Sequence, residues 1–358
     1  MNVVIHAPYE ASYAYRTIDA GWARAFSVLG HTVRLWRAGQ PMEEVLTPET
    51  DLFLTHCHWY YRRYINFKYL NFLRSHYKLK VIAKLDFWCQ DSVIPNFVSY
   101  IPMSLDKTVL SLIEKNQFAD IYHHVALASD PRMKGHDQVL PRPYVCIPLA
   151  ADSILWLQEH SPDCNDLSSR YQNSIIYIGS NQSEKKSYIK TNWSSLAPNY
   201  QVRFLGQDWT AQDVISGYIE RLGRTLNLKP LANIRRNRMP LIDEYYYYKF
   251  SQICFNVHLP EQRRYGTELN ERTFKIGLVG GFQVCDNVSL AKEMFGTTNA
   301  MIIASTPREW HDAVDHFLHH PLDQASYRLR LQTLVWAEHT YIHRISKLLH
   351  AVTDSSIT

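Results

Sequence analysis

The sequence lacks the features that mark secreted and membrane-spanning proteins. Its six cysteines form no Cys-x-x-Cys pair, and Cys146 and Cys254 lie inside apolar runs, which predicts reduced, buried thiols in a cytoplasmic protein. No run of about 18 apolar residues exists, so no transmembrane helix is predicted. The stretch Met1–His6 carries neither a basic segment nor a long apolar one, and it does not resemble a signal peptide.

An excess of charge of one sign is also missing. The chain has 38 Lys and Arg against 34 Asp and Glu, a formal net charge of +4 over 358 residues. This balance does not indicate a dedicated nucleic-acid binder, but it permits an anionic ligand such as a diphosphate. Hydrophobic residues make up 46% of the chain, which is typical of a globular protein, and its length fits two domains.

Short apolar segments alternate with longer helical patterns along the whole chain. Gly30 closes the first helical pattern, over 18–29, as a C-cap glycine does. Such alternation predicts parallel sheets covered by helices on both faces. Long helices are predicted over 59–77 and 322–349. The predicted strands are 2–7, 32–36, 51–55, 80–85, 121–128, 144–149, 174–178, 202–205, 252–257, 281–285 and 300–304.

A polar segment over 151–171, which carries Pro162, separates two series of strands and helices. It predicts a Rossmann-like domain over 1–150 and another over 151–358, with the option that the last helix packs back on the first domain. Parallel sheets bind ligands at the carboxyl ends of their strands, so we expect the chemistry in a cleft between the domains.

No Gly-x-Gly-x-x-Gly motif follows a predicted strand, so a nicotinamide dinucleotide site is poorly supported. The loop predicted after the first strand carries Tyr13, Tyr15 and Arg16. It is either an ordinary surface loop or a loop that contacts an acceptor substrate.

Two later segments are typical of phosphate binding. Gly179 and Ser180 precede a helix start with Lys185 and Lys186, where backbone N–H groups and cations meet. The alternative is a pair of solvated lysines. The second segment runs from Gly266 to Asp286. Its polar helix start holds Glu268, Asn270 and Arg272, its helix ends at Gly280-Gly281-Phe282, and the next strand ends at Asp286.

The second segment resembles the signature of the CgeB-like (spore-maturation-type) glycosyltransferases, Asn-x-Arg-x-Phe-Glu-x-x-x-x-Gly-Gly-Phe followed by Asp. These enzymes are related to the GT4-like, group 1 glycosyl transferases. Three further segments agree with the family in order and kind, and the resemblance covers most of 144–350. They are Tyr177–Ser180, Arg203–Gly206 and Glu338–Ile345.

The resemblance implies a GT-B fold, with two Rossmann-like, doubly wound domains facing a cleft. The C-terminal domain would bind a nucleoside diphosphate sugar and the N-terminal domain the acceptor, with no cofactor and no obligatory metal. The phosphate charge would be met by Lys185 or Lys186, Arg272, and Arg263 or Arg264. The implied donor-binding residues are Gly179, Ser180, Lys185, Lys186, Glu268, Asn270, Arg272, Gly280, Gly281, Phe282 and Asp286.

One residue departs from the family pattern. Lys275 stands where the family has a glutamate, which related transferases use on the nucleotide ribose. Glu268 or Glu271 is the alternative for that contact.

Candidate catalytic residues of the N-terminal domain are Asp86, His6 and His123, with a structural role as the alternative for each. His56-Cys57-His58 superficially resembles a metal site, but side chains alternate direction along a strand and no second ligand pair has matching spacing. The basic cluster Arg235–Arg238 is either a solvated loop or a contact to an anionic acceptor or nucleic acid.

The predicted function is transfer of a hexosyl or pentosyl group from a nucleoside diphosphate sugar to a hydroxyl acceptor. The acceptor alternatives are a polysaccharide, a protein glycan, a small metabolite and a modified nucleic-acid base. Lys275 motivates a rival prediction, a non-catalytic nucleotide- or glycan-binding module that keeps the fold. A second rival is an epimerase, which would consume a sugar nucleotide without an acceptor.

Overall fold

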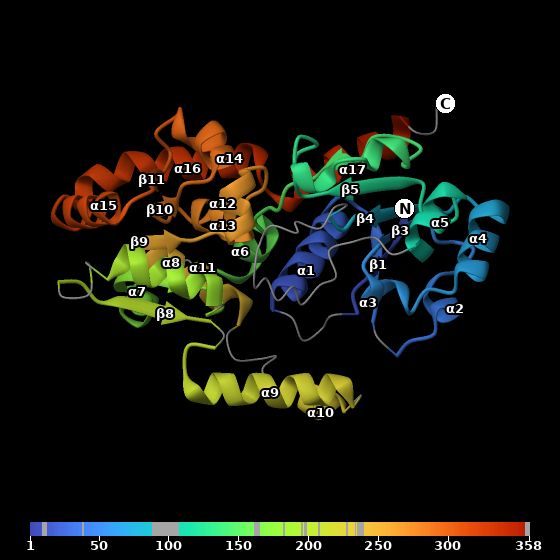
Figure 1. Cartoon of the computed structure of the whole chain (residues 1–358), viewed down its shortest axis with the longest axis horizontal. Helices are drawn as coiled ribbons and strands as arrows, with labels where there is room; N and C mark the ends of the chain where they lie inside the picture. Colours follow the sequence, from blue (N-terminus) through green and yellow to red (C-terminus); the bar gives the residue numbers. More distant parts are fainter. Residues whose placement is uncertain are drawn as a thin grey trace. The chain divides into compact units, whose positions relative to one another are not determined.

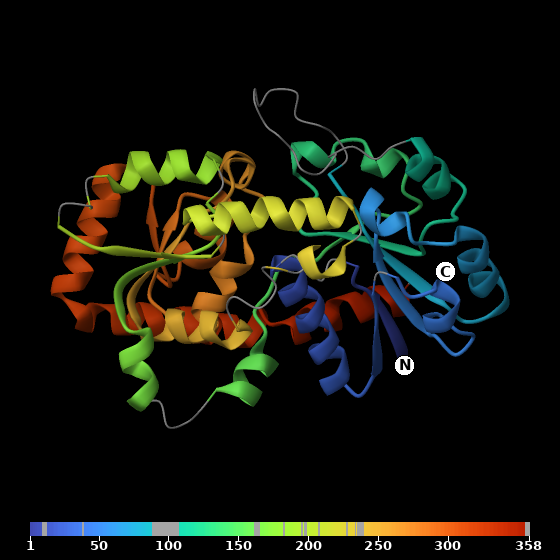
Figure 2. The same ribbon diagram turned by 90° about the horizontal axis from the view of Figure 1, so that it is seen from below.

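The chain forms two α/β units, which we describe separately (Figures 1 and 2). The first unit contains Met1–Pro148 and Ile342–Thr358, and the second contains Leu149–Tyr341. The sequence-based division lay between residues 150 and 151. The computed structural model describes residues 1–8, 13–37, 39–87, 107–160, 165–181, 183–194, 196, 199–206, 208–226, 228–232, 234 and 240–354.

The first unit is built on a six-stranded parallel sheet in the order β2-β1-β3-β4-β5-β6. Alternate residues of its strands, such as Val4, Phe53 and Val81, are buried in one core with Trp36. The strands are β1 (Asn2–His6), β2 (Thr32–Trp36), β3 (Leu52–His56), β4 (Lys80–Lys84), β5 (Ile121–His124) and β6 (Val145–Cys146).

Helix α1 of this unit contacts β1 and β2, and Gly30 follows it with a φ of +84°, as the C-cap prediction requires. Two 3₁₀ turns, η1 (Pro131–Met133) and η2 (His136–Gln138), precede β6. The helices are α1 (Tyr13–Val28), α2 (Met42–Val45), α3 (Trp59–Arg62), α4 (Phe67–His76), α5 (Lys107–Glu114) and α17 (Tyr341–Asp354).

The second unit has a five-stranded parallel sheet in the order β11-β10-β9-β7-β8. The chain runs from β7 outward to β8 and then returns to the other side of β7 for β9, β10 and β11. The order in which strands are added to the sheet therefore reverses between β7 and β9. Its strands are β7 (Asn173–Ile178), β8 (Val202–Leu205), β9 (Ser251–Asn256), β10 (Gln283–Asp286) and β11 (Ile302–Ala304).

Helices cover both faces of this sheet. Side chains of α8 and α15 share a core with Ile175, Phe255 and Val284, while α11 and α13 contact β9 and α13 packs on α16. The helices are α6 (Ser153–Glu159), α7 (Asn165–Tyr171), α8 (Ser183–Trp193), α9 (Ala211–Thr225), α10 (Lys229–Ala232), α11 (Leu241–Phe250), α12 (Pro260–Tyr265), α13 (Glu271–Leu278), α14 (Ser289–Ala291), the π-helix η3 (Lys292–Gly296), α15 (Pro307–His319), η4 (Pro321–Asp323) and α16 (Gln324–Glu338).

All eleven predicted strands are present, nine of them with shifted ends, but the two long helix predictions were wrong. The helix predicted over 59–77 is broken into α3 and α4, because Asn66 caps a new helix by accepting from Tyr69 N at 3.2 Å. The helix predicted over 322–349 is interrupted at Thr340, which forms a β-bridge with Ala151. Helix α1 begins at Tyr13, inside the predicted loop.

Among the described residues, no helix combines the length and apolarity that crossing a bilayer requires.

Candidate functional site

The reversal of strand order between β7 and β9 indicates where the second unit would bind a ligand. In a parallel sheet, ligands bind at the carboxyl ends of the strands where the strand order reverses. Gly179 follows β7 there, and Val257 and His258 follow β9. We call the group Gly179, Asn256, His258, Asn270, Arg272 and Asp286 the switch-point cluster.

Arg272 is the centre of the switch-point cluster. Its Nη1 donates to Asn256 Oδ1 at 3.0 Å and to Val257 O at 3.3 Å, and its guanidinium lies 4.8 Å from the centroid of the Tyr177 ring. Its Nε is buried without a hydrogen-bond partner. A Cβ at Gly179 would lie 2.5 Å from Arg272 Nη2, so the close approach requires glycine. A buried cation with an unsatisfied donor suits an anionic ligand.

The N-terminus of α13 lies beside this guanidinium. Asn270 is the N-cap residue: its Oδ1 accepts from Thr273 N at 3.1 Å, and its Nδ2 donates to Asn256 Oδ1 at 2.8 Å. Asn256 in turn donates to Thr273 Oγ1 at 2.9 Å. The first turn of a helix has N–H groups without intrahelical partners, and its dipole favours negative charge. Helix end and guanidinium therefore offer positive charge to the same place.

A buried His–Asp pair lies next to the helix end. The Nδ1 of His258 lies 2.6 Å from Asp286 Oδ1, and His258 N donates to Asp286 Oδ2 at 2.7 Å. Burial alone would raise the pKa of Asp286, but the charge and hydrogen bonds of His258, with a further contribution from Arg263, hold it below its ordinary value. Arg263 Nη1 also donates to His258 O at 2.5 Å. The pair fixes the loop after β9 and brings a second arginine to this edge.

Lys275 belongs to a buried ion-pair group. Its Nζ lies 3.0 Å from Glu244 Oε2 and 2.9 Å from Glu271 Oε2, and its side chain is buried. Burial alone would lower the pKa of Lys275, but the two carboxylates outweigh it and raise that pKa. Glu271 also accepts from Tyr341 Oη at 2.8 Å. The departure from the family pattern is thus part of a buried ion-pair group, and Glu271 is engaged there.

Three predicted donor-binding residues lie at the opposite edge of the sheet from the switch-point cluster. Gly280, Gly281 and Phe282 form the turn that leads into the start of β10, whereas the switch-point cluster lies at the strands' carboxyl ends. Gly280 has a φ of +72° and accepts from Arg328, and Phe282 is part of the core. Their role is to join a helix to a strand.

The remaining predicted donor residues are only partly brought together. Ser180 follows Gly179 directly, and Lys185 lies in the first turn of α8 with its side chain buried. Lys186 is exposed, and Glu268 is buried in the segment before α13.

In the first unit, the three candidate catalytic residues all lie at the carboxyl edge of the sheet. His6 ends β1, where its Nδ1 lies 3.0 Å from Thr55 Oγ1, and His123 lies in β5. Burial lowers the pKa of both histidines to about 3. Burial raises the pKa of Asp86, just after β4, to about 7, against the lowering effect of Lys84 and Arg62. A carboxyl group that titrates near neutral pH suits general base catalysis.

Two sequence predictions lie outside what the structure describes. The side chains of Tyr13, Tyr15 and Arg16 are not among the described parts of α1, and neither is the cluster Arg235–Arg238.

Within the described residues, the group that brings three possible metal ligands together is His258, Cys285 and Asp286, not His56-Cys57-His58. His258 and Asp286 already pair with each other. Burial and the neighbouring Asp286 raise the pKa of the Cys285 thiol, which keeps it protonated. We assign no metal to this group.

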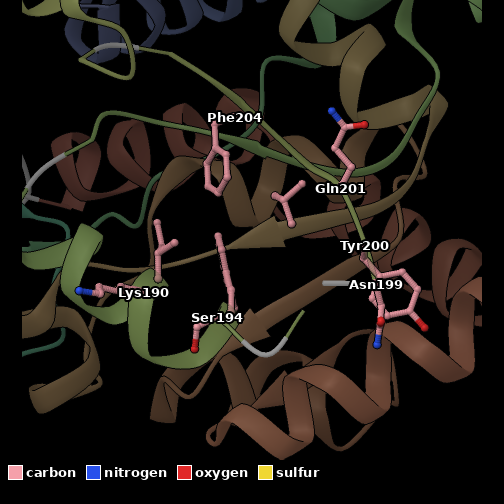
Figure 3. A pocket seen from close by; sticks show the side chains of 9 residues that line it. Lys190, Ser194, Asn199, Tyr200, Gln201 and Phe204 are labelled. Atoms are coloured by element: carbon pink, nitrogen blue, oxygen red, sulfur yellow. The ribbon is translucent and has the colours of Figure 1, made fainter. Parts of the chain in front are cut away.

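A cavity of about 570 Å³ lies elsewhere in the second unit, between the last turns of α8 and the start of β8 (Figure 3). Its lining is mostly apolar and aromatic, and includes Trp193, Tyr200 and Phe204. Val202, which also lines it, pairs with Ile175 near the start of β7, at the end of the strand opposite Gly179.

Sequence reasoning missed Asn256, His258 and Trp209. Trp209 Nε1 donates to Gly179 O at 2.6 Å, which places its indole against the loop after β7. The one available signal for Asn256 and His258 was their position at the end of a predicted strand, since no local motif includes them.

The profile of a family described as glycosyl transferase-like matches residues 189–350. No curated protein matches the chain.

Three solved structures illustrate the fold. The sucrose-phosphate synthase of Thermosynechococcus elongatus is 12% identical, with a TM-score of 0.59 over 99% of this chain and 100% of that chain. HepE of Anabaena in complex with UDP-glucose is 12% identical, with a TM-score of 0.57 over 99% and 100%. An alpha-glucosyltransferase in complex with UDP is 10% identical, with a TM-score of 0.62 over 99% and 100%.

These matches confirm the predicted fold, two parallel-sheet α/β domains of the GT-B type, and the predicted enzyme class. Over residues 189–350, the chain is similar to the glycosyl transferase-like family, and its fold is that of the solved glycosyltransferases.

Proposed function

We propose that the switch-point cluster binds the diphosphate of a nucleoside diphosphate sugar, whose sugar is transferred to a hydroxyl acceptor held by the first unit. The observation that carries the proposal is Arg272, a buried guanidinium with an unsatisfied Nε beside the N-terminus of α13. Arg272 and the helix end would stabilise the charge that develops on the leaving diphosphate. Asp86, with its pKa raised to about 7, is the proposed base that accepts the acceptor's proton.

Uridine is the base we propose for the donor, because HepE and the alpha-glucosyltransferase were solved with UDP-glucose or UDP. We also propose that protein cations, rather than a metal, meet the phosphate charge, since Arg272 and Arg263 both reach this edge. The CgeB-like subtype and a cytoplasmic location complete the proposal. They are supported by the Asn270-x-Arg272 signature and by the reduced cysteines.

Isothermal titration with UDP, GDP and UDP-glucose tests the donor site. UDP should bind, and Arg272→Ala should raise its Kd roughly 10- to 100-fold, because hydrogen bonds to charged groups contribute about 1.5–3 kcal/mol. Arg330→Ala is the matched control: this exposed arginine of α16 is not part of the proposed site and should leave Kd unchanged. Absence of binding by every nucleotide at millimolar concentration would overturn the proposal.

Product analysis separates the proposed transferase from its rivals. Slow release of UDP from a UDP-sugar identifies a transferase that uses water in place of its acceptor. Conversion of the sugar without UDP release identifies an epimerase. Tight UDP binding with neither product identifies a binding module.

A further inference from the structure

Histidines are concentrated at the end of α15. Four of the chain's 17 histidines lie within residues 311–320, and three of them, His316, His319 and His320, lie in the last turn of α15 or directly after it. All three side chains are exposed. A histidine-rich segment is typical of metal binding, because the neutral imidazole is a common ligand of transition metals.

Two of these histidines face each other at the spacing that chelates a metal on a helix. His320 N donates to His316 O at 2.8 Å, so His320 keeps the helical register four residues after His316. The two rings are stacked, with their centroids 4.7 Å apart. The Nδ1 of His320 lies 2.9 Å from His316 O, which leaves its Nε2 for a metal. Two histidines at positions i and i+4 on one helix face are a known zinc-binding arrangement.

Asp323 of η4 adds a carboxylate to this pair. Its Oδ2 lies 2.9 Å from His316 Nε2. Of two other aspartates nearby on α15, Asp312 pairs with an arginine of the same helix and Asp315 accepts from Tyr200 Oη. The side chains of His316 and Asp323 are 49% and 53% exposed, so both can rotate onto one ion without disturbing the core.

The histidine pair lies away from the switch-point cluster. Phe317, in the last turn of α15, packs on Phe282 with ring centroids 4.5 Å apart, and Phe282 directly precedes β10. The end of α15 therefore lies near the amino ends of the strands, whereas the switch-point cluster lies at their carboxyl ends.

We propose that His316, His320 and Asp323 form a binding site for a late first-row transition-metal ion such as Zn²⁺. Two imidazoles and one carboxylate are ligands that Zn²⁺ accepts, and water would complete the coordination. The ion would link the end of α15 to η4 and so stabilise the corner that leads into α16. This site goes beyond the proposed function and does not depend on it, because it lies at the other edge of the sheet.

Calorimetric titration of the untagged, full-length protein with zinc chloride, after treatment with EDTA and dialysis, tests the site. Zn²⁺ should bind and should raise the melting temperature as its concentration rises. His316→Ala and His320→Ala should each raise the Kd for Zn²⁺ about tenfold or more, and Asp323→Asn about threefold. Acidification from about pH 7.5 to about pH 5.5 should weaken binding, because a protonated imidazole holds no metal.

His76→Ala is the matched control. His76 is also exposed at the end of a helix, and its Nδ1 lies 3.0 Å from Phe72 O, but a phenylalanine stands where the partner histidine would be. This variant should keep the wild-type Kd for Zn²⁺. Mg²⁺ at about 5 mM should not compete, because Mg²⁺ prefers oxygen ligands.

Absence of Zn²⁺ binding by the wild type would overturn the proposal, and so would wild-type affinity in both His316→Ala and His320→Ala. Displacement of Zn²⁺ by Mg²⁺ would also overturn it, because the carboxylates alone would then hold the ion. With EDTA present, every variant should unfold at the wild-type urea concentration, since the replaced side chains are exposed. UDP affinity, measured in the same variants, should equal that of the wild type, which keeps this site separate from the donor site.

Discussion

At the scale of single residues, Lys275 shows how a departure from a family pattern can be structural. The family glutamate would stand beside Glu244 and Glu271, and in this chain a lysine bridges those two carboxylates instead. The residue therefore balances buried charge, and its presence does not by itself argue for an inactive protein.

Restoring the family residue with Lys275→Glu should destabilise the protein by about 3–5 kcal/mol, because it removes the cation of a buried ion-pair group and adds a third carboxylate. Urea unfolding measures the change. The double variant Glu244→Lys with Lys275→Glu should recover part of the lost free energy of unfolding, because a cation again faces the carboxylates. A Lys275→Glu variant that unfolds at the wild-type urea concentration would contradict this account of the group.

Other candidate site residues were identified from the family signature or from their position after a strand. Gly179, Asn270, Arg272 and Asp286 were identified from the sequence, and the structure brings all four to one edge of the sheet. Gly280 was assigned to the donor site because the family signature that contains Asn270 also contains Gly280-Gly281-Phe282. The 1.5 Å rise per residue of the intervening helix carries it to the opposite edge.

At the scale of elements, strands were easier to predict than helix ends. Each strand is a short apolar run, so composition alone identifies it, whereas a helix ends where a side chain or a distant segment takes over its hydrogen bonds. Asn66 is a local example, and Thr340, which meets Ala151 across the sequence, is a distant one. The exposure of Ile215 and Tyr218 on α9 was not predicted, since amphipathic spacing does not say which face of a helix is buried.

Two helix caps offer a matched comparison between stability and binding. Asn270→Ala removes the cap of α13 and Thr306→Ala removes the cap of α15, so each should lower the free energy of unfolding by about 1 kcal/mol. Asn270→Ala should also weaken UDP binding, because Asn270 holds Asn256, which accepts from Arg272. Urea unfolding and calorimetry separate the two effects. Equal UDP affinity in both variants would mean that the α13 terminus does not contact the nucleotide.

At the scale of the whole molecule, stability depends on pH through buried groups whose pKa values are shifted in opposite directions. The pKa of Asp86 is about 7 in the fold and its ordinary value is 3.8, so the native state binds more protons between these values and stability falls as pH rises through this window. His6 and His123, with pKa values of about 3 against 6.5, contribute stability that rises with pH between those values.

The difference in melting temperature between Asp86→Asn and wild type should therefore move in favour of the variant as pH rises from about 4 to about 7. For His6→Gln the difference should move in favour of the variant as pH falls below about 6.5, because the wild type must keep a neutral buried imidazole. Thermal unfolding in a series of buffers measures both. If the melting temperatures of both variants followed the same pH dependence as the wild type, the pKa values of Asp86 and His6 would be ordinary in the fold.

The indole of Trp209, held 2.6 Å from Gly179 O, has a practical consequence. Indole emission responds to charge and polarity in its surroundings, and this ring lies against the loop where the diphosphate is proposed to bind. The protein thus carries a built-in fluorophore at that loop. Arrival and departure of a nucleotide would be visible in real time, without a label and without knowledge of the acceptor.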